Sequence, residues 1–202
     1  MSLTIEDFGG RVATVWSELR PTTRGLVERA LQTSNSTSPP ARNVPYDSRA
    51  DLELSRLLTA LDDRASETAT ALETEKGDQL RRVADTCAAV LQEKTQSAEV
   101  FTQLVRRAHQ RRDYARIDTL ADALTARFAP SEICELSRSD DLIVRALANE
   151  AMAQVPLSVL IGLLSDPVDS EIARTALYRQ ATEYGSEEAR QVLNALDHVD
   201  EM

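Results

Sequence analysis

Few side chains in this sequence have the types and the spacing that catalysis or metal binding requires. The 202 residues include two histidines, His109 and His198, and two cysteines, Cys87 and Cys134. Arginines surround His109 and repel metal cations, whereas His198 lies in a DHVDEM tail, where adjacent residues lack the fixed geometry of a ligand set. No serine lies in a GxSxG elbow, and no glycine-rich loop is available to hold a phosphate. We therefore predict no catalytic, cofactor-binding or metal-binding residue, and a protein that is not an enzyme.

One basic cluster has residue types that could bind a partner. It consists of Arg106, Arg107, Arg111 and Arg112, with Arg116 close behind. Arginines four residues apart share one face of a helix, so the cluster could bind a phosphate, a nucleic-acid backbone or an acidic partner helix. Alternatively, arginines gather at a helix C-terminus, where the macrodipole favours them, and pair with nearby acids such as Asp113 and Asp118. We favour this second interpretation.

The net charge of −10 is unevenly distributed along the chain. Residues 131–202 carry 5 basic and 14 acidic side chains, a net charge of −9. Nucleic acids and anionic membranes both require clustered basic residues, so we expect neither as a partner and consider an acidic protein surface the better match for the arginine cluster. No apolar run approaches the ~20 residues of a membrane span, and the N-terminus MSLTIEDFGG does not resemble a signal peptide.

Composition and cysteine usage predict the class of protein. Hydrophobic residues make up 42% of the chain but aromatic residues only 4%, which disfavours β-sandwiches and barrels and predicts an all-α fold. Two lone cysteines exclude a disulfide scaffold. We expect a soluble, cytoplasmic protein, and the strong preference for arginine over lysine indicates a bacterial source.

The pattern along the chain predicts four parts. Residues 1–32 have the spacing of N-terminal helices, and Pro21 is expected to begin the second of them. Residues 33–47 are a Ser/Pro-rich linker or loop, and residues 48–95 form a helical hairpin. Leu54, Leu58 and Leu61 keep heptad spacing in a helix over 47–75, which predicts packing on a neighbouring helix, with a homodimer as a possibility. Gly77 is expected to end that helix.

The remaining part, residues 96–202, repeats itself. Short helical segments are predicted at 97–110, 113–128, 131–138, 141–154, 157–165, 169–184 and 187–197. Val144 and Ala148 are repeated as Ile172 and Ala176, 28 residues later. A period of two helices is typical of solenoids, because one helix pair cannot bury its own apolar faces and needs stacked neighbours.

Two of these segments resemble a known family of repeats. Val144, Arg145 and Ala148 fit the VRxxA pattern in the second helix of a HEAT repeat, and the segment 163–167, LLSDP, fits the turn between its two helices. The segment is also similar to leucine-rich-variant repeats, which are α-solenoids too. The next unit departs from the pattern, because Arg174 is shifted by one residue relative to the repeat. The alternative to a HEAT-like solenoid is an irregular α-helical bundle.

The resemblance implies a binding surface and no catalytic residue. The expected function is a non-enzymatic scaffold or protein–protein interaction module without a cofactor, whose partner is a protein. The partner-binding residues are expected on the inner faces of the second helices, around Arg145, Asn149, Arg174 and Arg179. The alternative function is a nucleic-acid-binding solenoid that uses the arginine cluster near residues 106–116 as its phosphate track.

Overall fold

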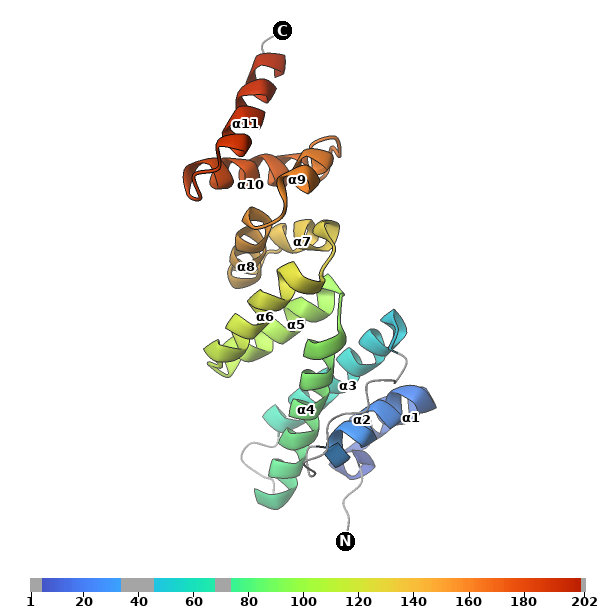
Figure 1. Ribbon diagram of the computed structural model, residues 1–202. Coiled ribbons are helices and arrows are strands. Elements are labelled where there is room, and N and C mark those ends of the chain that lie inside the picture. Colours follow the sequence, from blue (N-terminus) through green and yellow to red (C-terminus); the bar gives the residue numbers. More distant parts are fainter. Residues whose placement is uncertain (1–4, 34–45, 68–73, 201–202) are drawn as a thin grey trace. The chain divides into compact units, whose positions relative to one another are not determined.

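The computed structural model describes residues 5–33, 46–67 and 74–200. In these ranges the chain forms eleven α-helices and one 3-10 helix and has no strand, which confirms the all-α prediction (Figure 1). The chain divides into two compact units, Met1–Thr95 and Gln96–Met202. Most of the predicted linker, residues 34–45, lies outside the described residues.

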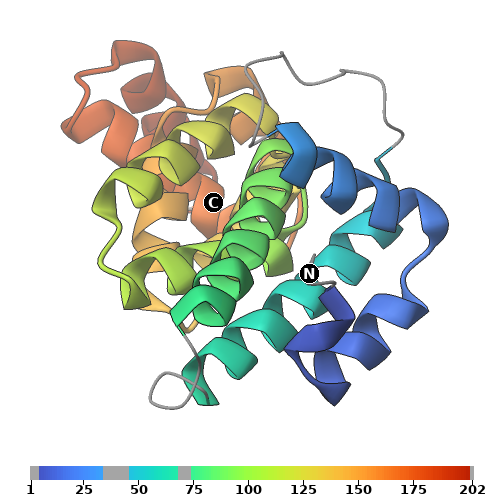
Figure 2. The same ribbon diagram turned by 90° about the horizontal axis from the view of Figure 1, so that it is seen from below.

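The first unit begins with a 3-10 helix, Ile5–Phe8. Its α-helices are α1 (Gly10–Glu18), α2 (Pro21–Thr33), α3 (Ser48–Glu67) and α4 (Thr74–Lys94). As predicted, Pro21 begins α2, because its fixed φ suits the first helical turn and its missing N–H is not needed there. Helix α3 packs along α4, while α1 packs on α3 and α2 packs on α4 (Figure 2).

The heptad leucines of α3 are used inside this unit. Leu54, Leu58 and Leu61 have no exposed surface, and they belong to the core between α3 and its neighbours. Residues 68–73 of the predicted helix lie outside the described residues. Packing on a neighbouring helix therefore accounts for the described leucines, and these side chains offer no surface to a second copy of the chain.

The predicted break at Gly77 is wrong. Described α3 ends at Glu67, and α4 already begins at Thr74, so Gly77 lies inside α4. A glycine in a helix costs about 1 kcal/mol relative to alanine. Gly77 is buried, and the packing of α4 on α2 and α3 offsets that cost.

The second unit contains seven helices between residues 96 and 200, one in each predicted segment. They are α5 (Ala98–Gln110), α6 (Tyr114–Arg127), α7 (Pro130–Ser137), α8 (Leu142–Ala153), α9 (Leu157–Leu163), α10 (Ser170–Thr182) and α11 (Glu187–Asp200). Local chemistry sets their ends. Pro130 begins α7, and Gly185 adopts a φ of 69° between α10 and α11, a conformation that glycine adopts without strain.

Successive helices of the second unit pack in pairs. The pairs are α5 with α6, α7 with α8, and α9 with α10, and they follow one another in chain order (Figure 1). The second helices also pack on each other, α6 on α8 and α8 on α10, while α11 packs on α10. The core between them is built from small and aliphatic side chains such as Leu120, Val144, Ala148 and Ala176.

Candidate interaction site

An aspartate precedes each second helix of the three pairs. Asp113, Asp141 and Asp169 are the N-cap residues of α6, α8 and α10, and successive members are 28 residues apart. The Asp141 carboxylate accepts hydrogen bonds from the backbone N–H groups of Ile143, at 3.0 Å, and Val144, at 3.3 Å. Asp113 likewise accepts from the Arg116 N–H at 3.1 Å, whereas the Asp169 side chain makes no such hydrogen bond. Where it occurs, capping of this kind satisfies backbone donors that have no partner inside the helix.

Two of these aspartates also bind an arginine from the preceding helix pair. Arg106, in the last turns of α5, donates from Nε to Oδ2 of Asp141 at 3.0 Å. Arg138, the C-cap residue of α7, donates from Nη1 to Oδ1 of Asp169 at 2.6 Å. We call these two contacts the Arg–Asp bridges. Each one ties the end of a first helix to the start of the second helix in the next pair.

The electrostatics of the bridges differ. Burial raises the pKa of the Asp141 carboxyl, but the hydrogen bonds from Arg106 and from two backbone N–H groups lower that pKa by more, so it lies below its usual range. At the other bridge, burial and the nearby charge of Asp169 raise the pKa of the Cys134 thiol to about 11. Cys134 is fully buried and Asp169 is nearly so. The bridge between Arg138 and Asp169 is therefore less exposed to solvent than the bridge between Arg106 and Asp141.

Helix α10 is also tied to the end of α8. Arg179 donates to the backbone oxygen of Asn149 at 2.9 Å and to Oε2 of Glu150 at 2.8 Å. Gln180 donates from Nε2 to the oxygens of Ala153, at 3.0 Å, and Val155, at 2.8 Å, so it caps the C-terminal end of α8. Ion pairs with Glu183 and Glu150 raise the pKa of Arg179 further above its usual range, and the guanidinium is charged at any physiological pH.

The structure divides the predicted arginine cluster. Arg106 belongs to a bridge, and Arg107 is only 7% exposed, in the apolar face of α5. Arg111 and Arg112 are exposed in the turn after α5, where Arg112 has a φ of 56°. With Arg107 buried and Arg106 bound to Asp141, the cluster offers only a short track for a nucleic-acid backbone, whose affinity grows with the number of phosphates contacted.

The residues predicted on the second helices lie on α8 and α10. One of them stabilises the start of its own helix, and two of them connect the two helices. Arg145 is half-buried and donates to the backbone oxygen of Ser139 at 2.9 Å, so it braces the turn before its own helix. Asn149 and Arg179 meet across α8 and α10, as described above. Arg174 is half-buried on α10, one helical turn before Tyr178.

Sequence reasoning missed the exposed apolar and aromatic side chains of this unit. Tyr178 and Tyr184 are 61% and 52% exposed, and the Tyr184 hydroxyl donates to Glu150. Three more, Tyr114, Leu142 and Val168, each lie next to an aspartate at an N-cap position. The recurring Asp at 113, 141 and 169 was a signal that could have directed attention to them.

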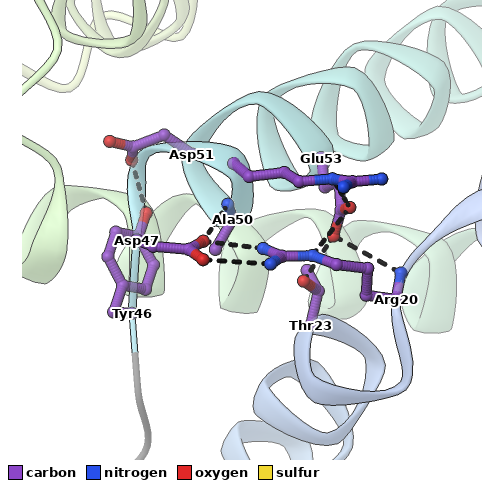
Figure 3. Close-up of polar contacts among 8 residues, drawn as sticks. Arg20, Thr23, Tyr46, Asp47, Ala50, Asp51 and Glu53 are labelled. Atoms are coloured by element: carbon purple, nitrogen blue, oxygen red, sulfur yellow. Dashed lines mark hydrogen bonds and ion pairs between the residues drawn. The ribbon is translucent and has the colours of Figure 1, made fainter.

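The first unit holds a polar cluster that is fully used in packing (Figure 3). Arg20 donates to Asp47 at 2.6 and 2.9 Å and to Glu53 at 3.0 Å, and Thr23 donates to the same glutamate. The hydrogen bond from Arg20 holds the pKa of Asp47 well below its usual range. Tyr46 donates to Asp51 in the first turn of α3. These contacts fix the start of α3 against the start of α2.

A small cavity of about 130 Å³ also lies in the first unit, between the start of α1 and the end of α3. The charged side chains that line it bind other groups of the protein. Arg11 pairs with Asp63 at 2.7 Å, and Arg64 donates to the backbone oxygen of Phe8 at 2.8 Å. Among the described residues, every buried side-chain nitrogen or oxygen has a hydrogen-bond partner, and no group of three His, Cys, Asp or Glu residues could hold a metal ion.

No single helix in the described ranges is long and apolar enough to cross a membrane. The apolar helices α8 and α9 reach that length only together, and they are bent by 116° at the break between them.

In the comparisons with known proteins, no family model, no curated protein and no solved structure matches the chain.

Proposed function

We propose that the protein is a non-enzymatic scaffold or protein-interaction module, and that residues 96–202 form a HEAT-like α-solenoid. The observation that carries this proposal is the 28-residue recurrence of Asp113, Asp141 and Asp169 at the starts of second helices that pack on one another in order. The two Arg–Asp bridges repeat the same contact from one pair to the next. Contacts between successive pairs are the basis of stability in solenoids.

The proposed binding surface is on α8 and α10. The side chains of α10 that we assign to this surface are Tyr178, which is 61% exposed, and Arg174, four residues earlier on the same helix face. Tyrosine and arginine are the residue types that most often anchor protein interfaces, because they bury large areas and form directed hydrogen bonds. The partner class is therefore a protein.

A capture experiment tests this proposal. The full chain and its Tyr178→Ala and Arg174→Glu variants are used as baits in extracts of the native cells, with Leu52→Ala as a matched control. Leu52 is 50% exposed and belongs to the first unit, so its truncation leaves α10 untouched. We expect a protein that the wild type and the control retain and both α10 variants lose. Equal capture by all four baits would contradict the assignment of the surface to α10.

Retention on immobilised DNA tests the alternative of nucleic-acid binding. If the arginine cluster binds a phosphate backbone, the wild type is retained on immobilised DNA in a salt-dependent way and the double variant Arg111→Glu/Arg112→Glu is not. No retention at low salt excludes this alternative.

A cytoplasmic location is also proposed, because both cysteines are free thiols, as is usual in a reducing compartment.

A further inference from the structure

Three exposed apolar side chains lie where the second helices begin. Tyr114 is the first residue of α6 and is 60% exposed, and Leu142 is the first residue of α8 and is 72% exposed. Val168, which is 64% exposed, lies two residues before the start of α10. None of them belongs to the buried core. A single exposed apolar residue is ordinary, but three at the starts of helices that pack on one another form a recurring feature.

The packing of α6 on α8 and of α8 on α10, together with the Arg–Asp bridges, places the starts of these helices along one edge of the second unit. Tyr114 follows the short turn after α5, and Arg106 of α5 binds Asp141 beside Leu142. Arg138 then binds Asp169, beside Val168, and its Nη1 also lies 3.4 Å from the Val168 backbone oxygen. We call this the turn edge, defined by the segments 111–114, 138–142 and 166–169. Because α6 packs on α8 and α8 on α10, these segments follow one another in that order.

The turn edge carries a charge gradient. Its first segment, 111–114, contains two arginines and one aspartate, and its middle segment, 138–142, contains one arginine and two aspartates. The last segment, 166–169, contains two aspartates and no basic residue. Arg106 compensates Asp141 and Arg138 compensates the nearly buried Asp169. The net charge that remains is therefore +1 in the first segment, −1 from Asp140 in the second and −1 from Asp166 in the third.

We propose that the turn edge binds a second copy of this chain around a two-fold axis near Leu142. A two-fold axis reverses the direction of the edge, so the basic segment of each copy faces the acidic segment of the other. Leu142 then meets its own counterpart, and Tyr114 of each copy lies over Val168 of its partner. A partner with a uniform charge would match only one end, whereas a second copy matches both. This inference does not rest on the α10 surface proposed above.

The charge gradient makes a direct test possible. Arg112 and Asp166 are exposed residues at the two ends of the edge, and the arrangement brings each one opposite the other across the interface. In an Arg112→Glu homodimer, two glutamates face two aspartates, and in an Asp166→Arg homodimer, two arginines face two arginines. When the two variants are mixed, both contacts are between opposite charges again. We therefore expect each variant alone to be monomeric and their mixture to form a heterodimer.

The measurement is sedimentation velocity on the full chain over a concentration series. We expect the wild type to dimerise weakly, because a narrow edge buries less than a standard interface, and each charge variant to weaken the dimer about tenfold or more. Asp166 also accepts a hydrogen bond from the Val168 N–H at 2.8 Å, so circular dichroism must show that Asp166→Arg is folded. If Asp166→Arg does not fold, the single variant Asp166→Asn replaces it. Mixing Asp166→Asn with Arg112→Glu is then expected to restore part of the dimer.

Leu142→Glu provides a second and independent variant. It places two carboxylates at the two-fold axis and is expected to abolish the dimer, whereas Leu52→Glu, at an exposed leucine of the first unit, is expected to leave it intact. A wild type that stays monomeric at every concentration would overturn the proposal. A dimer that all the edge variants retain would also overturn it. The same holds if the two charge variants, each monomeric alone, fail to associate when mixed.

Discussion

Removing Arg138 tests whether the Arg–Asp bridges stabilise the second unit. We consider the Arg138→Met variant, which keeps most of the aliphatic length of the side chain and removes its charge. Asp169 is then left 9% exposed without its arginine, next to the fully buried Cys134. A buried carboxylate that loses its only cationic partner is strongly destabilising.

The expected magnitude follows from the exposure of the two partners. Breaking a fully buried pair costs about 3–5 kcal/mol, and an exposed pair contributes about 0–1 kcal/mol. Because the Arg138 side chain is 42% exposed, water screens this bridge in part, and we expect the free energy of unfolding to fall by about 1–2 kcal/mol. Arg106→Met is the matched control. Arg106 is 55% exposed and Asp141 keeps its two backbone donors, so this variant should lose about 0.5 kcal/mol or less.

Urea unfolding followed by far-ultraviolet circular dichroism measures both losses. With a slope of about 1–3 kcal/mol per molar urea, Arg138→Met should lower the midpoint by roughly 0.5–1 M. Fluorescence of Trp16, the only tryptophan, reports the first unit separately. If Arg138→Met costs no more than Arg106→Met, burial of Asp169 does not control the strength of the bridge.

Three further predictions concern acid, thiols and the turn before α11. The pKa values of Asp141 and Glu150 are lower in the folded state than in the unfolded chain. Their contribution to the free energy of unfolding is therefore complete above pH ~5 and should be lost as the pH falls through the folded-state pKa values. An acid titration of the urea midpoint measures this loss, and a midpoint unchanged down to pH ~3 would contradict it. Both Cys87 and Cys134 are fully buried, and with a pKa of about 11 only about one in a thousand Cys134 thiols is ionised at pH 8, so a thiol reagent should label the native protein slowly and both sites rapidly in urea. Gly185→Ala should cost about 1 kcal/mol in the same urea assay, because a φ of 69° strains an L-residue even though open space surrounds the new methyl group; an unchanged midpoint would show that the turn relaxes.

Local signals in the sequence were sufficient to locate most helices. Proline at 21 and 130 and the capping residues Asp141 and Ser186 act on neighbouring backbone groups, so their effect depends on only a few residues. Gly77 shows where such signals fail. A glycine ends a helix only if tertiary packing does not favour continuing it, and the packing of α4 is a property of the folded unit.

The roles of the arginines were harder to predict, because their partners are distant in sequence. Arg106 was expected to pair with nearby acids, but it binds Asp141, 35 residues away. Only the order in which helix pairs stack brings these two residues together. Burial of Arg107, in contrast, was open to prediction. It lies three residues after Leu104 and seven after Val100, which places it on the apolar face of α5.

The distance between two spin labels on α6 and α10 tests the proposed stacking most directly. Thr119 and Thr175 are exposed residues at equivalent positions, 56 residues or two repeats apart, and the native cysteines are too buried to be labelled in the folded protein. Labels at Thr119→Cys and Thr175→Cys should be separated by two helix spacings, about 20 Å, in one narrow distribution, in protein diluted with unlabelled chain. A separation of about 10 Å, or a broad distribution, would mean that α8 does not lie between α6 and α10, and would contradict the solenoid.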